Sequence, residues 1–112
     1  MIELVIKDWL EQQLQVPVYL ELPETMPAAE WVLVEKTSGG KTNHLPRSTV
    51  AVQSYAPSMY RAAVLNDKVI DAMDSIVALD VVASSTLNSD YPYTDTQLKA
   101  YRYQAVYDLK HY

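Results

Sequence analysis

The chain has 112 residues and no cysteine, which predicts a single domain and excludes disulfides, thiolate metal sites and cysteine nucleophiles. It has 9 Lys and Arg against 14 Asp and Glu, a formal net charge of -5, and no basic cluster, which argues against sequence-driven binding to nucleic acid. No apolar run approaches the roughly 18 residues of a membrane span, and no basic region opens a signal peptide, so we expect a cytoplasmic product.

Residues 2–14 repeat apolar side chains at helical spacing, which predicts a helix that ends before Pro17. A short strand is predicted at 18–22, and the two prolines within 23–30 predict a loop. The expected buried stripe of the helix consists of Ile2, Val5, Ile6, Trp9, Leu10 and Gln13.

Two β-branched runs, 31–37 and 48–55, flank the segment that holds both glycines of the chain. They predict an antiparallel hairpin with a long projecting tip at 38–46, in which Gly39 and Gly40 supply positive φ angles.

Gly-Lys-Thr at 40–42 matches the end of a phosphate-binding loop. That motif needs an earlier glycine where Glu35 stands, and it must open a helix, whereas a strand is predicted to follow. We therefore expect no nucleotide binding.

The second half of the chain predicts a helix at 56–77, a strand at 79–87, a polar loop with tyrosines at 88–99, and a final strand at 100–112. One side of the final strand is apolar and aromatic, with Tyr101, Tyr103, Ala105, Tyr107 and Leu109. This side is expected to pack beneath the helices, with a subunit interface as the alternative. Residues 1–112 then form one α+β domain, in which two helices pack on a mixed, mostly antiparallel sheet of four to five strands in the order αβββαββ.

Three aspartates, Asp67, Asp71 and Asp74, share one face of the second predicted helix. Solvated carboxylates are the usual explanation for such a face, and a Ca²⁺ or Mg²⁺ site would need ligands from further elements.

A calcium loop at Asn88, Asp90 and Asp95 matches only loosely, because Pro92 stands where the third ligand belongs. His44 and His111 have no serine and carboxylate arranged near them in the sequence. We expect no enzymatic activity, no cofactor and no metal site.

Several stretches resemble a family of phage proteins: VPVYLELPETMP after the first helix, VLVEKTSGG leading into TVAVQSYAPSMYRAAVLNDKVIDAM, and YPYTD ahead of YRYQAVYDL. The family is the tail-terminator (tail-completion, gpU-like) proteins of long-tailed bacteriophages and prophages. The resemblance covers nearly the whole chain, and residues 55–58 and 102–104 contribute most to it. It implies a structural virion protein that forms a ring, usually a hexamer, which caps the finished tail tube and joins it to the head.

The resemblance implies three partners: further copies of the chain, the tail tube protein, and a head-completion or connector protein. It also implies a place in the virion tail after assembly in the bacterial cytoplasm. No membrane and no sequence-specific nucleic acid is expected as a partner. The alternatives are another head–tail connector, head-completion or minor capsid protein, or a protein-binding module unrelated to phages.

The family has no motif that identifies its interface residues. The two partner-binding surfaces expected here are therefore predicted from the side chains of this sequence alone. Polar, glycine-containing tips and exposed tyrosines both commonly form binding surfaces. The first is the hairpin tip, with Gly39, Gly40, Lys41, Thr42, Asn43 and His44; the second is the loop with Asp90, Tyr91, Tyr93 and Asp95.

Overall fold

A computed structural model describes residues 1–42, 45–94 and 100–112. The chain forms α1 (Ile2–Leu14), β1 (Val18–Tyr19), β2 (Trp31–Thr42), β3 (Leu45–Ala56), α2 (Met59–Asp74), the 3₁₀ helix η1 (Ile76–Ala78), β4 (Val82–Pro92) and β5 (Tyr101–His111). The five strands form one sheet in the order β1-β2-β3-β5-β4, in which β1 is parallel to β2 and the other neighbours are antiparallel. The predicted α+β class and element order are confirmed. In these described ranges no helix has the length and apolarity needed to cross a membrane.

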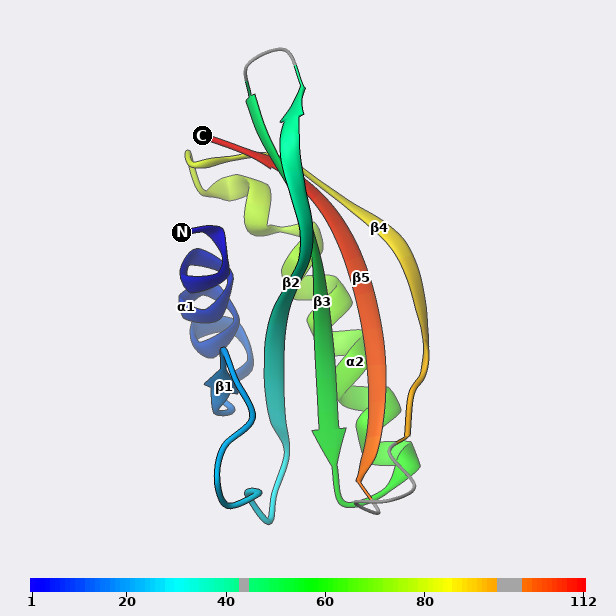
Figure 1. The fold of residues 1–112 in the computed structure, drawn as a ribbon. Coiled ribbons are helices and arrows are strands. Elements are labelled where there is room, and N and C mark those ends of the chain that lie inside the picture. Colours follow the sequence, from blue (N-terminus) through cyan, green and yellow to red (C-terminus); the bar gives the residue numbers. More distant parts are fainter. Residues whose placement is uncertain (43–44, 95–99) are drawn as a thin grey trace.

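Both helices pack on the same face of the sheet, and the opposite face has no helix on it (Figure 1). The core lies between them and joins Ile6, Leu10, Val69 and Met73 of the helices to Val34, Val50, Val52, Ala105, Tyr107 and Leu109 of the sheet. The predicted packing of this side of β5 beneath the helices is thereby confirmed. Tyr101, at the start of the strand, remains 42% exposed.

Helix α1 has the predicted bounds and ends at Gln15, which adopts a left-handed conformation with φ 57° and donates its N–H to the Glu11 carbonyl. Trp9 is half-buried against the core, and its Nε1–H donates to the carbonyl of Ala72 in α2 at 2.8 Å. Gln13 is exposed, so its predicted place on the buried stripe is wrong. It lies at the edge of the stripe, where its amide can remain in water.

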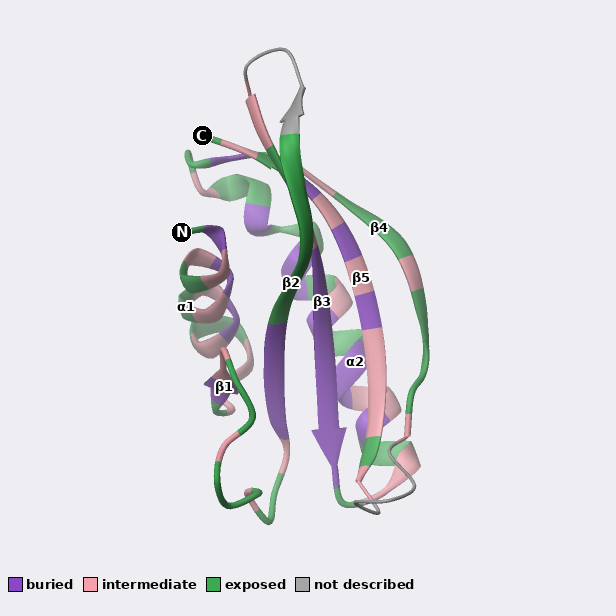
Figure 2. Ribbon diagram, viewed as in Figure 1, coloured by how far each residue is buried: buried purple, intermediate pink, exposed green. Residues whose placement is uncertain are grey.

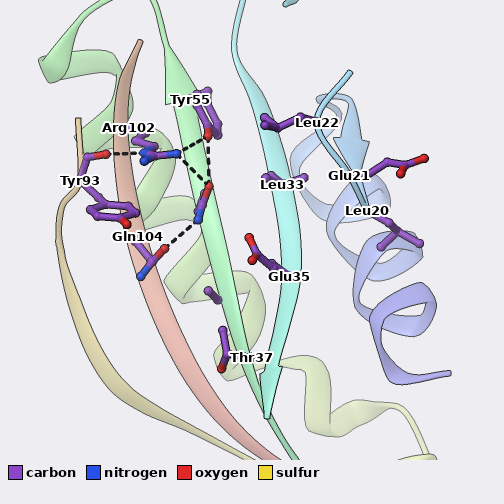
Figure 3. A pocket seen from close by; sticks show the side chains of 12 residues that line it. Leu20, Glu21, Leu22, Leu33, Glu35, Thr37, Tyr55, Tyr93, Arg102 and Gln104 are labelled. Atoms are coloured by element: carbon purple, nitrogen blue, oxygen red, sulfur yellow. Dashed lines mark hydrogen bonds between the residues drawn. The ribbon is translucent and has the colours of Figure 1, made fainter. Parts of the chain in front are cut away.

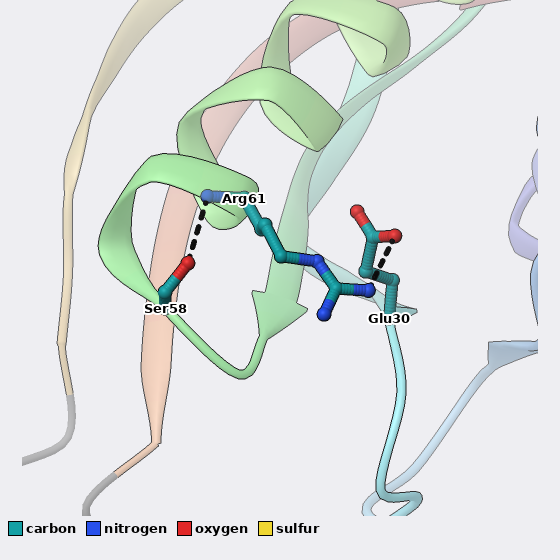
Figure 4. Close-up of polar contacts among 3 residues, drawn as sticks. All are labelled: Glu30, Ser58 and Arg61. Atoms are coloured by element: carbon teal, nitrogen blue, oxygen red, sulfur yellow. Dashed lines mark hydrogen bonds and ion pairs between the residues drawn. The ribbon is translucent and has the colours of Figure 1, made fainter.

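Helix α2 is shorter than predicted at both ends. Ala56 still belongs to β3, where it pairs with Tyr101, so the helix begins only after Ser58. The Ser58 hydroxyl accepts a hydrogen bond from the Arg61 backbone N–H at 3.2 Å (Figure 4). The Arg61 guanidinium also pairs with Glu30 at 3.1 Å, which fastens the preceding loop to the helix.

Two strands have different bounds from those predicted. Strand β1 has only two residues, because its pairing with β2 covers Val18 and Tyr19 alone. Strand β4 begins three residues later and extends through Pro92, because Leu79 is held in the turn after η1, where its N–H donates to Ile76 and its carbonyl accepts from Val82. Residues 88–92 therefore belong to a strand rather than to the predicted loop.

The hairpin of β2 and β3 also differs from prediction. The two strands remain paired through Thr42↔Leu45, so most of the expected tip is strand. Neither glycine has a positive φ, which overturns the turn role predicted for Gly39 and Gly40. A polar segment with two glycines has a low propensity to form a strand, but here pairing with β3 overrides that propensity.

We call residues 38–42 and 45–47, the far end of the β2–β3 hairpin, the arm. Its pairing with β5 is limited to Arg47↔Lys110, so it projects past the rest of the sheet (Figure 1). The described side chains of its β2 strand are exposed, in contrast to the buried lower half of β2 (Figure 2). Asn43 and His44 lie outside the described residues.

Candidate functional site

The helix-free face of the sheet is hollowed into a groove of about 650 Å³. One wall is apolar and consists of Leu20 and Leu22, from the segment after β1, and Leu33 of β2. The opposite wall is polar and comes from β3, from β5 and from Tyr93, which follows β4 (Figure 3). The groove is thus amphipathic across its width.

Two amides and a tyrosine form the polar wall. Gln53 Nε2 donates to Gln104 Oε1 at 2.8 Å, and the Tyr55 hydroxyl donates to Gln53 Oε1 at 3.1 Å (Figure 3). Gln53 is only 6% exposed, so these bonds satisfy an amide that would otherwise be costly to bury. Their satisfaction fixes the wall in one arrangement.

Arg102 supplies the positive charge of this wall. Its Nη1 donates to the Tyr55 hydroxyl at 2.6 Å, and its Nε donates to the Tyr93 carbonyl. The guanidinium also lies 4.2 Å from the centroid of the Tyr93 ring, within range of a cation–π interaction. Arg102 is therefore held in place by neutral groups rather than by a carboxylate among the described residues.

Beneath the polar wall lies a small aromatic cluster. Tyr55 is 2% exposed and stacks on Trp31, with centroids 4.0 Å apart and ring planes within 8°. Tyr19 meets the Trp31 ring edge-on at 5.6 Å. These contacts hold Tyr55, which lines the groove, in a packed aromatic cluster.

Carboxylates border the groove on the β2 side. Glu21 and Glu35 both line it and are exposed. A second hollow, of about 280 Å³, lies between the start of α1 and β2; it is bordered by Glu3 and Lys36 and shares Glu35 with the groove. The ion pairs formed within the described residues, Lys7–Glu11 and Glu30–Arg61, involve none of these three carboxylates.

The structure places the second predicted surface partly at this groove. Tyr93 lines it, and the Tyr91 hydroxyl accepts from Gln104 Nε2 at 2.6 Å. The two tyrosine rings meet edge-on, 6.0 Å apart. Asp90 accepts a hydrogen bond from the buried Asn66 of α2 at 3.1 Å and is thereby tied to the helix side of the sheet. Asp95 lies outside the described residues.

The first predicted surface lies far from the tyrosines. Gly39, Gly40, Lys41 and Thr42 belong to β2 within the arm, at one end of the hairpin, whereas Tyr55 and its partner Arg102 lie at the other end of β3. The two predicted surfaces are therefore separate.

The other candidate residues, His111 and the three aspartates of α2, lie outside the groove. Ser48 Oγ and His111 Nε2 share a hydrogen bond at 3.0 Å, the geometry of a nucleophile and its base. Ser48 is only 1% exposed, however, so the pair is closed to a substrate. Asp67, Asp71 and Asp74 are exposed on α2, and the part of the chain that the structure describes holds no group of three possible metal ligands.

Asp108 and Tyr107 both lie outside the groove and have shifted pKa values. Hydrogen bonds from Asn88 and from Thr49, at 3.0 and 2.8 Å, lower the pKa of Asp108. Burial raises the pKa of Tyr107, with a further contribution from the charge of Asp74.

The polar wall was not predicted as a site. Sequence alternation places Arg102 and Gln104 on the polar side of β5, but only the register of the sheet sets Gln53 opposite Gln104 and Tyr55 opposite Arg102. The only hint in the sequence was that Gln53 and Gln104 both fall on the sides of their strands that face away from the core.

No protein-family model matches the chain, and no curated protein matches it significantly. Its function is therefore inferred from the geometry and from the resemblance of the quoted stretches.

Proposed function

We propose that this chain is a structural virion protein, a tail terminator whose copies form a ring that caps the tail tube and joins the tail to the head. The observation that supports this function best is the pairing of a helix-free, grooved sheet face with an arm that projects past the body. A subunit in a ring contacts two neighbours through two different surfaces, and these two features could supply them.

Two further properties suit such a subunit. Tyrosines are enriched at protein interfaces, and Tyr91 and Tyr93 lie at the rim of the groove, 39% and 45% exposed. The net charge of -5 disfavours retention of DNA that must pass through the ring. The resemblance to tail terminators adds the specific role, and a hexamer is the stoichiometry that it implies.

Inactivating the gene in the phage or prophage that encodes it tests this function. Electron microscopy of the particles should show tail tubes of uncontrolled length, without attached heads. Tails of normal length that fail to join heads would instead indicate another head–tail connector component. Unchanged, infectious particles would rule out both roles.

A further inference from the structure

We propose that the arm of one copy docks in the groove of the next copy, so that the ring closes through a repeated arm-to-groove contact. This inference rests on the proposed function, because it names the contact by which the ring would form.

The chain separates its charges strongly. Residues 36–66 contain four Lys and Arg and no Asp or Glu, a net charge of +4. The remainder of the chain is therefore at -9, given the total of -5. The arm itself contributes Lys41 and Arg47 to this basic segment and has no carboxylate.

The glycines of the arm leave room for two of the cations of this segment. A Cβ on Gly39 would stand 3.1 Å from Lys36 Nζ, and a Cβ on Gly40 would stand 4.0 Å from Arg47 Nη2. The strand thus has two positions without side chains, and a long cationic side chain lies against each of them. This arrangement keeps the arm thin while it presents positive charge.

The groove matches the arm in both charge and polarity. Its β2 side offers Glu21 and Glu35. Its apolar wall offers leucines, of which Leu22 is 54% exposed, to the Leu45-Pro46 pair of the arm. The groove cation, Arg102, is already bound to tyrosines on the far wall.

The arm cannot reach its own groove. It continues the direction of β2 and β3 away from the body, whereas the groove lies along the lower part of the same strands (Figure 1). A second copy must therefore supply the groove. Contacts between two different surfaces propagate from copy to copy and close into rings when the rotation permits.

Nucleic acid is the alternative binding partner for a basic arm. Lys36 pairs across the strands with the core residue Val50, whereas Arg47 pairs with Lys110, on the polar side of β5. Lys36, just before the arm, and Arg47 therefore point to opposite faces of the hairpin, so these two cations do not form one phosphate-binding patch. The acidic body would also repel a polyanion.

Reversing charges on each surface tests the contact. The arm variant is Lys41→Glu with Arg47→Glu, and the groove variant is Glu21→Lys with Glu35→Lys. Each should weaken self-association at least about tenfold in sedimentation velocity, and one chain with all four changes should recover it. The matched control, Glu24→Lys with Asp67→Lys, changes the same number of exposed carboxylates elsewhere and should assemble normally.

Cross-linking gives a second measurement, since the chain has no native cysteine. Mixing a Leu45→Cys chain with a Glu35→Cys chain under oxidation should give a covalent heterodimer. Mixing Leu45→Cys with Asp67→Cys should not, because Asp67 lies on α2.

Three results would overturn the inference. They are a monomer at all concentrations, assembly unaffected by either reversal, and no recovery in the four-change chain despite native circular dichroism. Loss of binding to a fluorescent DNA duplex in the arm variant, with assembly intact, would assign the arm to nucleic acid instead. Apart from the monomer, these outcomes leave ring formation by other contacts open. The proposed function would then be judged separately, by tail length.

Discussion

Lys36 lies over Gly39: a Cβ on that glycine would stand 3.0 Å from Lys36 Cε and 3.1 Å from its Nζ. The glycine leaves room for the end of the Lys36 side chain, and its backbone has no positive φ. The next residue, Gly40, has more space, with Arg47 Nη2 at 4.0 Å as its near neighbour.

Alanine at these two positions should have small and unequal effects. Gly40→Ala should raise the free energy of unfolding by about 0.4–1 kcal/mol, because the native backbone suits alanine and the unfolded chain loses freedom. Gly39→Ala should gain less, since the lysine must move aside. Urea denaturation measures both. A loss above about 1 kcal/mol in both variants would show that the backbone does require glycine.

The arm should be dispensable for folding. Replacing residues 40–47 by Asn-Gly leaves Gly39↔Ser48 as the closing pair and supplies a two-residue hairpin turn. Because the described arm residues bury little, the melting temperature should stay within a few degrees of the parent while ring formation is lost. Differential scanning calorimetry and native mass spectrometry measure the two properties. A shortened chain that still forms rings would remove the arm from assembly.

Trp9 should link the two helices measurably. Trp9→Phe removes the 2.8 Å hydrogen bond to the Ala72 carbonyl and should cost about 1 kcal/mol. Trp9→Ala also removes the packing of the indole and should cost about 3 kcal/mol or more. Chemical denaturation gives both values. Equal losses in the two variants would mean that the ring packing contributes nothing beyond the hydrogen bond.

Tyr107 should make stability fall at high pH. Its hydroxyl is buried and finds no hydrogen-bond partner among the described residues, and burial raises its pKa above the usual 10.0. Above pH 10 the unfolded tyrosine loses its proton while the folded one keeps it, so the unfolded state binds fewer protons and stability declines. The decline attributable to this residue approaches about 1.4 kcal/mol per pH unit.

The Tyr107→Phe variant isolates this effect. At pH 7 it should be at least as stable as the parent, because it removes a buried polar group without a partner. Between pH 10 and 11.5 its stability should fall less steeply than that of the parent. Parallel slopes in urea melts across this range would show that the hydroxyl reaches water.

The sequence predicts those elements whose side chains repeat over a full core face. The apolar spacing of Ile6 and Leu10 located α1, and the alternation around Tyr107 located β5. The observed strand ends differ from the predicted ones where pairing with a neighbouring strand, rather than the side-chain pattern, determines the structure. Ser38–Thr42 extend β2 because β3 runs alongside, and Asn88–Pro92 extend β4 because β5 does.

The groove was out of reach for a different reason. Its walls come from β2, β3 and β5, from the segment after β1 and from Tyr93, which follows β4. Gln53 and Gln104, which bond to each other across the polar wall, are 51 residues apart in the sequence. Their meeting depends on a register that local propensity does not determine. Tyr91 and Tyr93 lie two residues apart, so the alternation of an extended chain was enough to expect their side chains on the same side.

The stacked pair of Trp31 and Tyr55 gives the protein a natural optical reporter. Tyr55 lines the groove and lies face to face with one of only two tryptophans, the other being Trp9 on the far side of the sheet. In a Trp9→Phe chain, indole emission would come from Trp31 alone. Filling of the groove could then be followed by fluorescence in real time, without an attached dye.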